Sequence, residues 1–133
     1  MDRLLRKLET ARHELPAPVV DETAASSTGL IAFGSTDAAV IEARQDLAVA
    51  GRPVDYLRLR ALPLSDEVVA FISRHDRVYV VEQNRDGQLY DLIRLALPAE
   101  LVNRVSSIRH YNGQPIPAVA ITEPLLAAEA VTT

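Results

Sequence analysis

From residue 29 onward, short runs typical of β-strands alternate with longer segments typical of α-helices. The strand-like runs are LIAFG, VDYLRLRAL, RVYVVE and RVSSIRHY. The helix-like segments that follow them are STDAAVIEARQDLAVAG, SDEVVAFISRH, DGQLYDLIRLAL and PAVAITEPLLAAEAV. Continuous apolar strands that alternate with helices are typical of a parallel sheet buried on both faces. The sequence therefore predicts a three-layer α/β/α fold with a mostly parallel sheet.

Residues at the ends of the predicted helices fit helix boundaries. Ser35 or Thr36 is expected to be the N-cap of the first helix, because a hydroxyl oxygen can accept a hydrogen bond from a free backbone N–H, and Gly51 ends that helix. Ser65 is expected to cap the second helix in the same way. The last helix contains Pro124, which has no backbone N–H, so we expect an interruption or a restart there.

The first 15 residues have a pattern of their own, in which apolar residues recur at spacings of three and four. These residues are Leu4, Leu5, Leu8, Ala11 and Leu15. The spacing predicts an amphipathic helix that ends at Pro16. We therefore expect an N-terminal helix over residues 1–15 and one domain over residues 16–133. Val19 and Val20 predict a short strand at an edge of the sheet, where a neighbouring proline does little harm.

Composition indicates one soluble domain and excludes several functions. The chain has 133 residues, and its 14 basic and 18 acidic side chains give a net charge of −4, which leaves no broad basic face for nucleic acid. The lack of Cys excludes disulfides, cysteine nucleophiles and thiolate metal sites within these residues. The apolar runs are shorter than the roughly 18 to 20 residues that span a bilayer, and the charged N-terminus is unlike a signal peptide. We therefore expect a cytoplasmic protein with no nucleic-acid or membrane partner.

Polar side chains follow the predicted strands, which is where parallel sheets bind their ligands. In FGSTD a Gly precedes a helix, as in a phosphate-binding loop, but Asp37 puts a negative charge where the phosphate would lie. Helix capping explains this stretch better, with weak polar contact to a ligand as the alternative. A phosphate-accepting receiver domain needs clustered carboxylates and a Lys at a late strand end, whereas the second strand offers Arg58 and Arg60. A receiver-like switch is therefore only a third hypothesis.

The three histidines are scattered along the chain. His13 lies on the first predicted helix, His75 at a helix end and His110 at a strand tip. Metal sites and catalytic dyads need imidazoles that converge with other ligands or with a nucleophile, and this spacing predicts neither. His75 is interpreted as a favourable cation near a helix C-terminus. His110 and the adjacent Tyr111 are placed where a ligand or a neighbouring domain could reach them.

The stretch EQNRDGQ, residues 82 to 88, crowds charged and amide groups into one loop. Glu82 follows a strand, Asn84 and Gly87 suit a turn, and Asp86 can cap the next helix. A lone Glu with no acid partner or metal is weak support for catalysis. This structural explanation covers about half of the polar groups in the loop.

The remaining groups of the loop predict a contact surface. Gln83, Arg85 and Gln88 can form hydrogen bonds to another domain or chain without any tuning of a pKa. The candidate contact residues at the strand tips are Glu82, Gln83, Asn84, Arg85, Gln88, Arg58, Arg60, His110 and Tyr111.

Four stretches resemble the C-terminal region of the alpha subunit of 2-oxoacid:ferredoxin oxidoreductases, the 2-oxoglutarate type most of all. The resemblance runs in order from about residue 4 to about residue 121. The stretches are GLIAFGSTD, VDYLRLRALPL, HDRVYVVEQNRDGQLYDLIRL and RHYNGQPI, and YVVEQNRDGQL is the most specific part. The resemblance implies a transketolase C-terminal-like domain, also known as the pyruvate:ferredoxin oxidoreductase domain II family. Its five-stranded sheet would have the order 1-3-2-4-5, with a first strand, residues 18 to 20, antiparallel to the rest.

The resemblance also implies an enzyme whose chemistry lies in other parts of the assembly. In this family thiamine diphosphate and Mg²⁺ bind between two other domains, iron–sulfur clusters carry electrons to ferredoxin, and coenzyme A accepts the acyl group as the 2-oxoacid is decarboxylated. The activating glutamate lies upstream, and the metal motif lies in a partner subunit. RDGQ, residues 85 to 88, lacks the first Gly of that motif, and iron–sulfur ligation would need Cys. No catalytic, cofactor-binding or metal-binding residue is therefore assigned to this chain.

Two hypotheses from different classes follow. In the first, the chain is a non-catalytic domain that contacts the remainder of an alpha subunit, the beta subunit and, indirectly, ferredoxin, or that self-associates as a homodimer, and it is inactive when isolated. In the alternative, it is a stand-alone small-ligand or regulatory binding module of the same fold. Because Met1 aligns far along the family's chain, we expect either an excised or a separately encoded piece.

Overall fold

The computed structural model describes residues 16–62, 64–84 and 86–132. The helix predicted over residues 1–15 lies outside these described residues. So does Arg85, one of the candidate contact residues.

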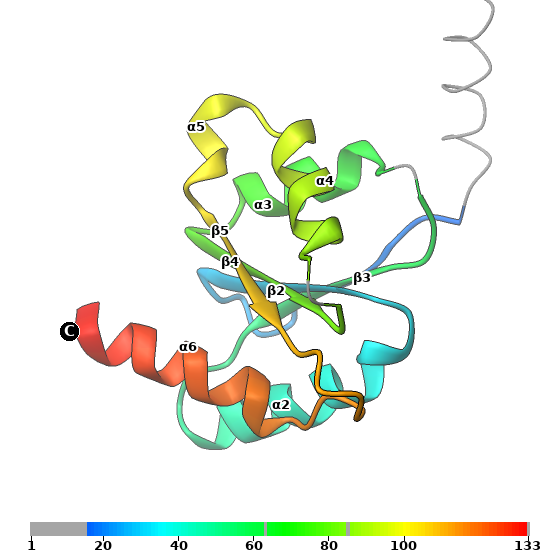
Figure 1. Ribbon diagram of the computed structural model, residues 1–133. Helices are drawn as coiled ribbons and strands as arrows, with labels where there is room; N and C mark the ends of the chain where they lie inside the picture. Colours follow the sequence, from blue (N-terminus) through cyan, green and yellow to red (C-terminus); the bar gives the residue numbers. More distant parts are fainter. Residues whose placement is uncertain (1–15, 63, 85, 133) are drawn as a thin grey trace, which may run out of the picture.

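One mixed sheet of five strands forms the middle layer (Figure 1). The strands are β1 (Val19–Asp21), β2 (Thr28–Phe33), β3 (Asp55–Leu59), β4 (Arg77–Glu82) and β5 (Val105–Arg109). Their order is β1-β3-β2-β4-β5; β1 is antiparallel to β3, and the other pairs are parallel. The predicted order, the edge position of the first strand and its antiparallel direction are all confirmed.

Helices cover both faces of the sheet, as the alternating pattern predicted. They are the 3-10 turn η1 (Gly34–Thr36), α2 (Asp37–Val49), α3 (Asp66–Ser73), α4 (Gln88–Ala96), α5 (Ala99–Val102) and α6 (Val119–Thr132). Figure 1 shows α2 and α6 on one face, and α3, α4 and α5 on the other. No helix in the described part of the chain has the length and apolar character needed to cross a membrane.

The sheet separates two hydrophobic cores. Leu30 of β2 packs in the core under α2 and α6, whereas the next residue, Ile31, packs in the core under α3 and α4. Successive side chains of a strand point to opposite faces, so an uninterrupted apolar run is what a sheet buried on both sides requires. Both side chains are fully buried.

Gly29 leaves room at the start of β2 for the ring of Phe71 from α3. A Cβ atom added at Gly29 would lie 2.7 Å from two ring carbons of Phe71 and 3.4 Å from Cδ2 of His75. A contact of 2.7 Å is far inside van der Waals distance, so a side chain here would push α3 away from the sheet.

His75 lies near the C-terminus of α3, where the sequence placed it, and its side chain is also a buried partner of a carboxylate. Its Nε2 lies 2.8 Å from Oδ2 of Asp55 at the start of β3, and its Nδ1 lies 2.6 Å from the carbonyl oxygen of Phe71. Both side chains of the pair are almost fully buried. The pair connects the end of α3 to the start of β3.

The predicted helix caps are only partly correct. Ser65 is the N-cap of α3, with the extended backbone that a cap requires, although its hydroxyl makes no capping bond. Thr36 is at the N-cap position of α2, but its backbone is already helical because η1 precedes it, and its side chain caps nothing. The N-cap of α4 is Gly87, so the prediction that Asp86 caps this helix is wrong.

Helix α6 continues through Pro124, so the predicted interruption does not occur. A proline inside a helix removes one backbone hydrogen bond and introduces a clash. Its neighbours Ile121 and Leu125 are buried in the core against α2, which holds the helix in place on both sides of the proline.

Candidate functional site

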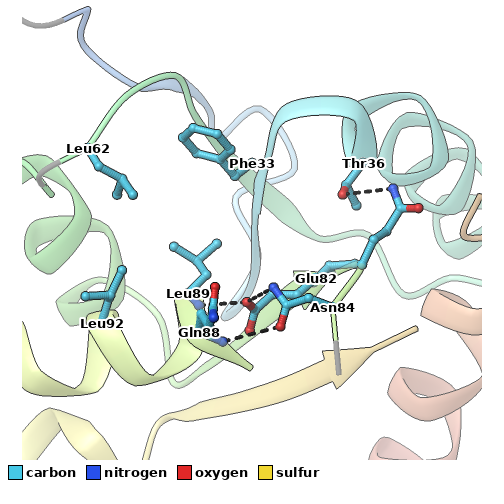
Figure 2. A pocket seen from close by; sticks show the side chains of 10 residues that line it. Phe33, Thr36, Leu62, Glu82, Asn84, Gln88, Leu89 and Leu92 are labelled. Atoms are coloured by element: carbon cyan, nitrogen blue, oxygen red, sulfur yellow. Dashed lines mark hydrogen bonds between the residues drawn. The ribbon is translucent and has the colours of Figure 1, made fainter. Parts of the chain in front are cut away.

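The candidate site is the edge of the sheet where the four parallel strands end. The loops that follow β2, β3, β4 and β5 all start at this edge, which is where open α/β sheets bind their ligands. A cleft of about 320 Å³ opens between the ends of β2 and β4 and the start of α4. Its lining includes Phe33, Leu62, Glu82, Gln88 and Leu92 (Figure 2).

Glu82 lies at the bottom of this cleft and is the last residue of β4. Its Oε1 accepts hydrogen bonds from the backbone N–H of Leu89 at 2.7 Å and from the side-chain amide of Asn84 at 3.1 Å. Its Oε2 accepts a hydrogen bond from the backbone N–H of Tyr90 at 3.1 Å. These two backbone groups belong to the first turn of α4, where an anion is favoured. Glu82 therefore caps the helix that follows its own strand.

Asn84 closes the loop above Glu82. Its Oδ1 accepts a hydrogen bond from the backbone N–H of Gly87 at 2.8 Å, as an Asn in a tight turn often does. Gly87 has a φ of +63°, and a Cβ atom there would lie 3.3 Å from Cδ of Arg109. The predicted turn at these two positions is confirmed, and the positive φ of Gly87 is a backbone conformation that favours glycine.

Gln83 connects three loops of the edge. Its Nε2 donates to the hydroxyl of Thr36 after β2, at 3.3 Å. Its Oε1 accepts from the backbone N–H of Ile116, in the loop before α6, also at 3.3 Å. Gln83 is a candidate contact residue, and its amide also forms these two internal hydrogen bonds.

At the second strand tip, Arg58 lies within β3, as the strand-like run VDYLRLRAL predicted. Its Nε is 3.8 Å from Oδ1 of Asp37, the oxygen that also accepts a hydrogen bond from the hydroxyl of Tyr56 at 2.9 Å. Burial raises the pKa of Tyr56 far above its usual range, and the hydrogen bond to Asp37 raises it further. Arg60 lies beyond the strand and is exposed.

His110 and Tyr111 border a second hollow of about 570 Å³ at the same edge. It is also lined by Gln83, Gly113, Gln114 and Pro115. The Nε2 atom of His110 is buried and has no hydrogen-bond partner among the described residues, whereas the Tyr111 side chain is exposed.

The structure thus brings most candidate residues to one edge but divides them into two groups. Glu82, Asn84 and Gln83 hold the edge together from inside. Gln88 and Arg60 are exposed there, as is Tyr111. In the described ranges, no three His, Asp or Glu side chains converge as a metal site would require.

Sequence reasoning missed the apolar rim of the cleft. Phe33, Leu62 and Leu92 keep 41%, 45% and 45% of their surface exposed. In the sequence, Phe33 reads as the end of a buried strand and Leu92 as part of an apolar helix. The helical position of Leu92 could have identified it as a rim residue, because Leu92 lies beside the buried stripe of α4 formed by Leu89 and Ile93.

Comparison with known proteins gives structural neighbours only. No protein-family model matches the chain, and neither does any curated protein. Among solved structures, the 2-oxoglutarate:ferredoxin oxidoreductase from Magnetococcus marinus, with 2-oxoglutarate, coenzyme A and succinyl-CoA bound, is similar with a TM-score of 0.68 and 27% identity. That match covers 77% of this chain but 18% of the oxidoreductase chain.

Two further structures share the fold. A split-gene transketolase, an inactive beta4 tetramer, has a TM-score of 0.61 at 16% identity and covers 80% of this chain and 39% of its own. The alpha chain of a probable 2-oxoacid ferredoxin oxidoreductase from Thermoplasma acidophilum has a TM-score of 0.52 at 21% identity, with coverage of 88% and 98%. The resemblance seen in the sequence is therefore confirmed at the level of structure: the chain has a transketolase C-terminal-like fold, and its structural neighbours include 2-oxoacid:ferredoxin oxidoreductases.

Proposed function

We propose that this chain is a non-catalytic structural and interaction domain of a 2-oxoacid:ferredoxin oxidoreductase, of the 2-oxoglutarate type. The similarity to the Magnetococcus marinus enzyme supports this, since 77% of this chain matches while most of that much longer chain has no counterpart here. The complete enzyme would decarboxylate the 2-oxoacid, transfer the acyl group to coenzyme A and pass the electrons to ferredoxin. Thiamine diphosphate, Mg²⁺ and iron–sulfur clusters would be held by its other domains and subunits.

The observation that supports this proposal most strongly is the hydrogen bonding of the Glu82 carboxylate. Both of its oxygens accept hydrogen bonds from backbone N–H groups of α4, and the side chain is buried. A general acid or base must exchange a proton with substrate within hydrogen-bond reach. A carboxylate whose oxygens cap a helix is instead a structural group. The most conspicuous carboxylate of the polar loop therefore supports the loop rather than a reaction.

The exposed side chains of the edge are the proposed contact surface. Gln88, Arg60 and Tyr111 are exposed in three different loops or helix starts around the hydrogen-bonded pair of Glu82 and Asn84. Exposed aromatic and Arg side chains are enriched in interfaces. The proposed partners are the remainder of an alpha subunit and the beta subunit, with residues 16–133 as the folded unit.

An activity measurement tests this proposal. The purified 133-residue chain is mixed with 2-oxoglutarate, coenzyme A, thiamine diphosphate, Mg²⁺ and a viologen dye as electron acceptor. We expect no dye reduction, because the domain holds none of the reacting groups. A complete 2-oxoglutarate:ferredoxin oxidoreductase serves as the positive control. Coenzyme A-dependent dye reduction by the isolated chain would overturn the proposal.

The alternative, a stand-alone small-ligand or regulatory module, is favoured by one observation. The cleft of about 320 Å³ combines apolar walls with amide groups, as small-molecule sites do. The two candidates differ in solution behaviour, which sedimentation over a range of concentrations can measure. Self-association through an uncovered surface supports the interaction domain, whereas a monomer at every concentration supports the module.

A further inference from the structure

Helix α4 carries apolar side chains on its solvent side as well as on its buried side. Leu89 and Ile93 are buried in the core between α4 and the sheet, as expected for an amphipathic helix. On the solvent side, Leu95 keeps 85% of its surface exposed and Leu92 keeps 45%. These two residues are three positions apart, so they are neighbours on the helix surface. They form an apolar ridge where a surface helix normally has polar residues.

The apolar surface continues on both sides of this ridge. Leu92 lines the cleft together with Phe33 and Leu62, whose side chains are also exposed (Figure 2). Leu95 borders a further hollow of about 430 Å³ between α4 and α5. The other residues that line this hollow are Asp91, Arg94 and Val102. Contiguous exposed apolar side chains mark a surface that another molecule covers.

One acidic and one basic side chain lie beside the ridge. Asp91 and Arg94 are both exposed, three positions apart on α4. The guanidinium group of Arg94 lies over the ring of Tyr90, 5.3 Å from the ring centroid. In the part of the chain that the structure describes, neither Asp91 nor Arg94 forms an ion pair. Both charges are therefore available to a partner that carries the opposite charges at the same spacing.

A second copy of the chain carries those charges. When two α4 helices pack antiparallel about a twofold axis, the residues of one helix face those of the other in reversed order. Asp91 of each copy then lies opposite the partner's Arg94, and symmetry forms this pair twice. A parallel pair of helices would instead place like charges opposite each other, which is unfavourable. The charge pattern of α4 is thus complementary to itself in the antiparallel direction.

We propose that α4 forms the centre of a homodimer interface, in which two copies pack their ridges of Leu92 and Leu95 together with the helices antiparallel. Phe33 and Leu62 extend the apolar contact on the side of the cleft. The pairs of Asp91 with Arg94 determine the direction of the helices and add little affinity, because exposed ion pairs are weak. Since few side chains take part, we expect a weak dimer with a dissociation constant in the micromolar range.

The inference rests on the proposed function in one respect, because self-association distinguishes an interaction domain from a ligand module. Sedimentation equilibrium of the 133-residue chain from about 1 µM to about 1 mM tests the interface. We expect a reversible equilibrium between monomer and dimer. Leu95→Asp should abolish the dimer, because it places a charge in the apolar contact. Val49→Asp is the matched control and should dimerise normally, since Val49 is 90% exposed but ends α2, on the other face of the sheet (Figure 1).

Charge reversal tests the pairing of Asp91 with Arg94. In a dimer of Asp91→Arg chains basic groups face each other, and in a dimer of Arg94→Asp chains acidic groups do. Each variant alone should therefore dimerise at least about tenfold more weakly than the original chain. A mixture of the two variants should form a heterodimer, because every acidic position then faces a basic one. Circular dichroism verifies that each variant is folded.

Three results would overturn this interface. A chain that stays monomeric up to about 1 mM has no such contact. A dimer that persists in Leu95→Asp would show that another surface mediates self-association, which would leave the proposed function intact. Charge-reversed variants that dimerise as tightly as the original chain would contradict the antiparallel pairing. Dye reduction that depends on coenzyme A would instead overturn the proposed function, so the two failures can be distinguished.

Discussion

Replacement of His75 by Leu is expected to lower the free energy of unfolding by about 3 to 5 kcal/mol, the usual result of leaving a buried charged group without its partner. Oδ2 of Asp55 accepts a hydrogen bond from the backbone N–H of Ser26, so it also acts as the acceptor toward Nε2 of His75. The other ring nitrogen faces a carbonyl oxygen, that of Phe71. His75→Leu would leave the Asp55 carboxylate buried without its main partner.

Urea denaturation followed by circular dichroism measures this effect. His110→Leu is the control, because His110 has no ion pair among the described residues and its buried Nε2 has no partner. We expect that control to change stability by less than about 1 kcal/mol. The double variant Asp55→Val, His75→Leu should recover part of the loss, since apolar replacement of a whole buried pair is often nearly neutral. Equal stabilities of the His75→Leu and His110→Leu variants would contradict this explanation.

Replacement of Glu82 by Ala is expected to cost about 2 to 3 kcal/mol. Two backbone N–H groups of α4, those of Leu89 and Tyr90, would lose their acceptor, and each unsatisfied buried donor costs about 1 to 3 kcal/mol. Loss of a helix cap alone is typically worth about 1 kcal/mol. Denaturation gives the total, and hydrogen exchange should show faster exchange at these two amides.

Two further variants test whether the loss in Glu82→Ala comes from the lost helix cap. Glu82→Gln keeps one acceptor oxygen and is expected to cost about half as much as Glu82→Ala. Gln88→Ala changes an exposed side chain in the same helix turn, so its effect should stay within about 0.5 kcal/mol. If Glu82→Ala were as stable as the original chain, the carboxylate would have a role other than capping.

The arrangement of the sheet could be predicted because it follows from local patterns. Continuous apolar runs identified β2, β3 and β4 as strands buried on both faces, and their alternation with helices required parallel connections. The edge position of Val19 and Val20 followed from the prolines before them. The strand order came from the resemblance, since periodicity alone does not determine which strands are neighbours.

The details of the site could not be predicted because they depend on residues that are distant in sequence. Glu82 and Tyr90 are eight positions apart, so no local capping rule identifies their hydrogen bond. The internal hydrogen bonds of Gln83 could not be predicted, because its partners Thr36 and Ile116 are distant in sequence and lie beside it only in the folded chain. The pairing of His75 with Asp55 likewise spans two different elements of the fold.

We propose that the polar edge of this sheet supports contacts while the chemistry lies in other domains. Isothermal titration calorimetry of the 133-residue chain with thiamine diphosphate and Mg²⁺ tests this proposal. We predict heats no larger than those of dilution, with no saturation. A saturable heat with a micromolar dissociation constant would contradict the proposal, because the cofactor would then bind to groups of this domain itself.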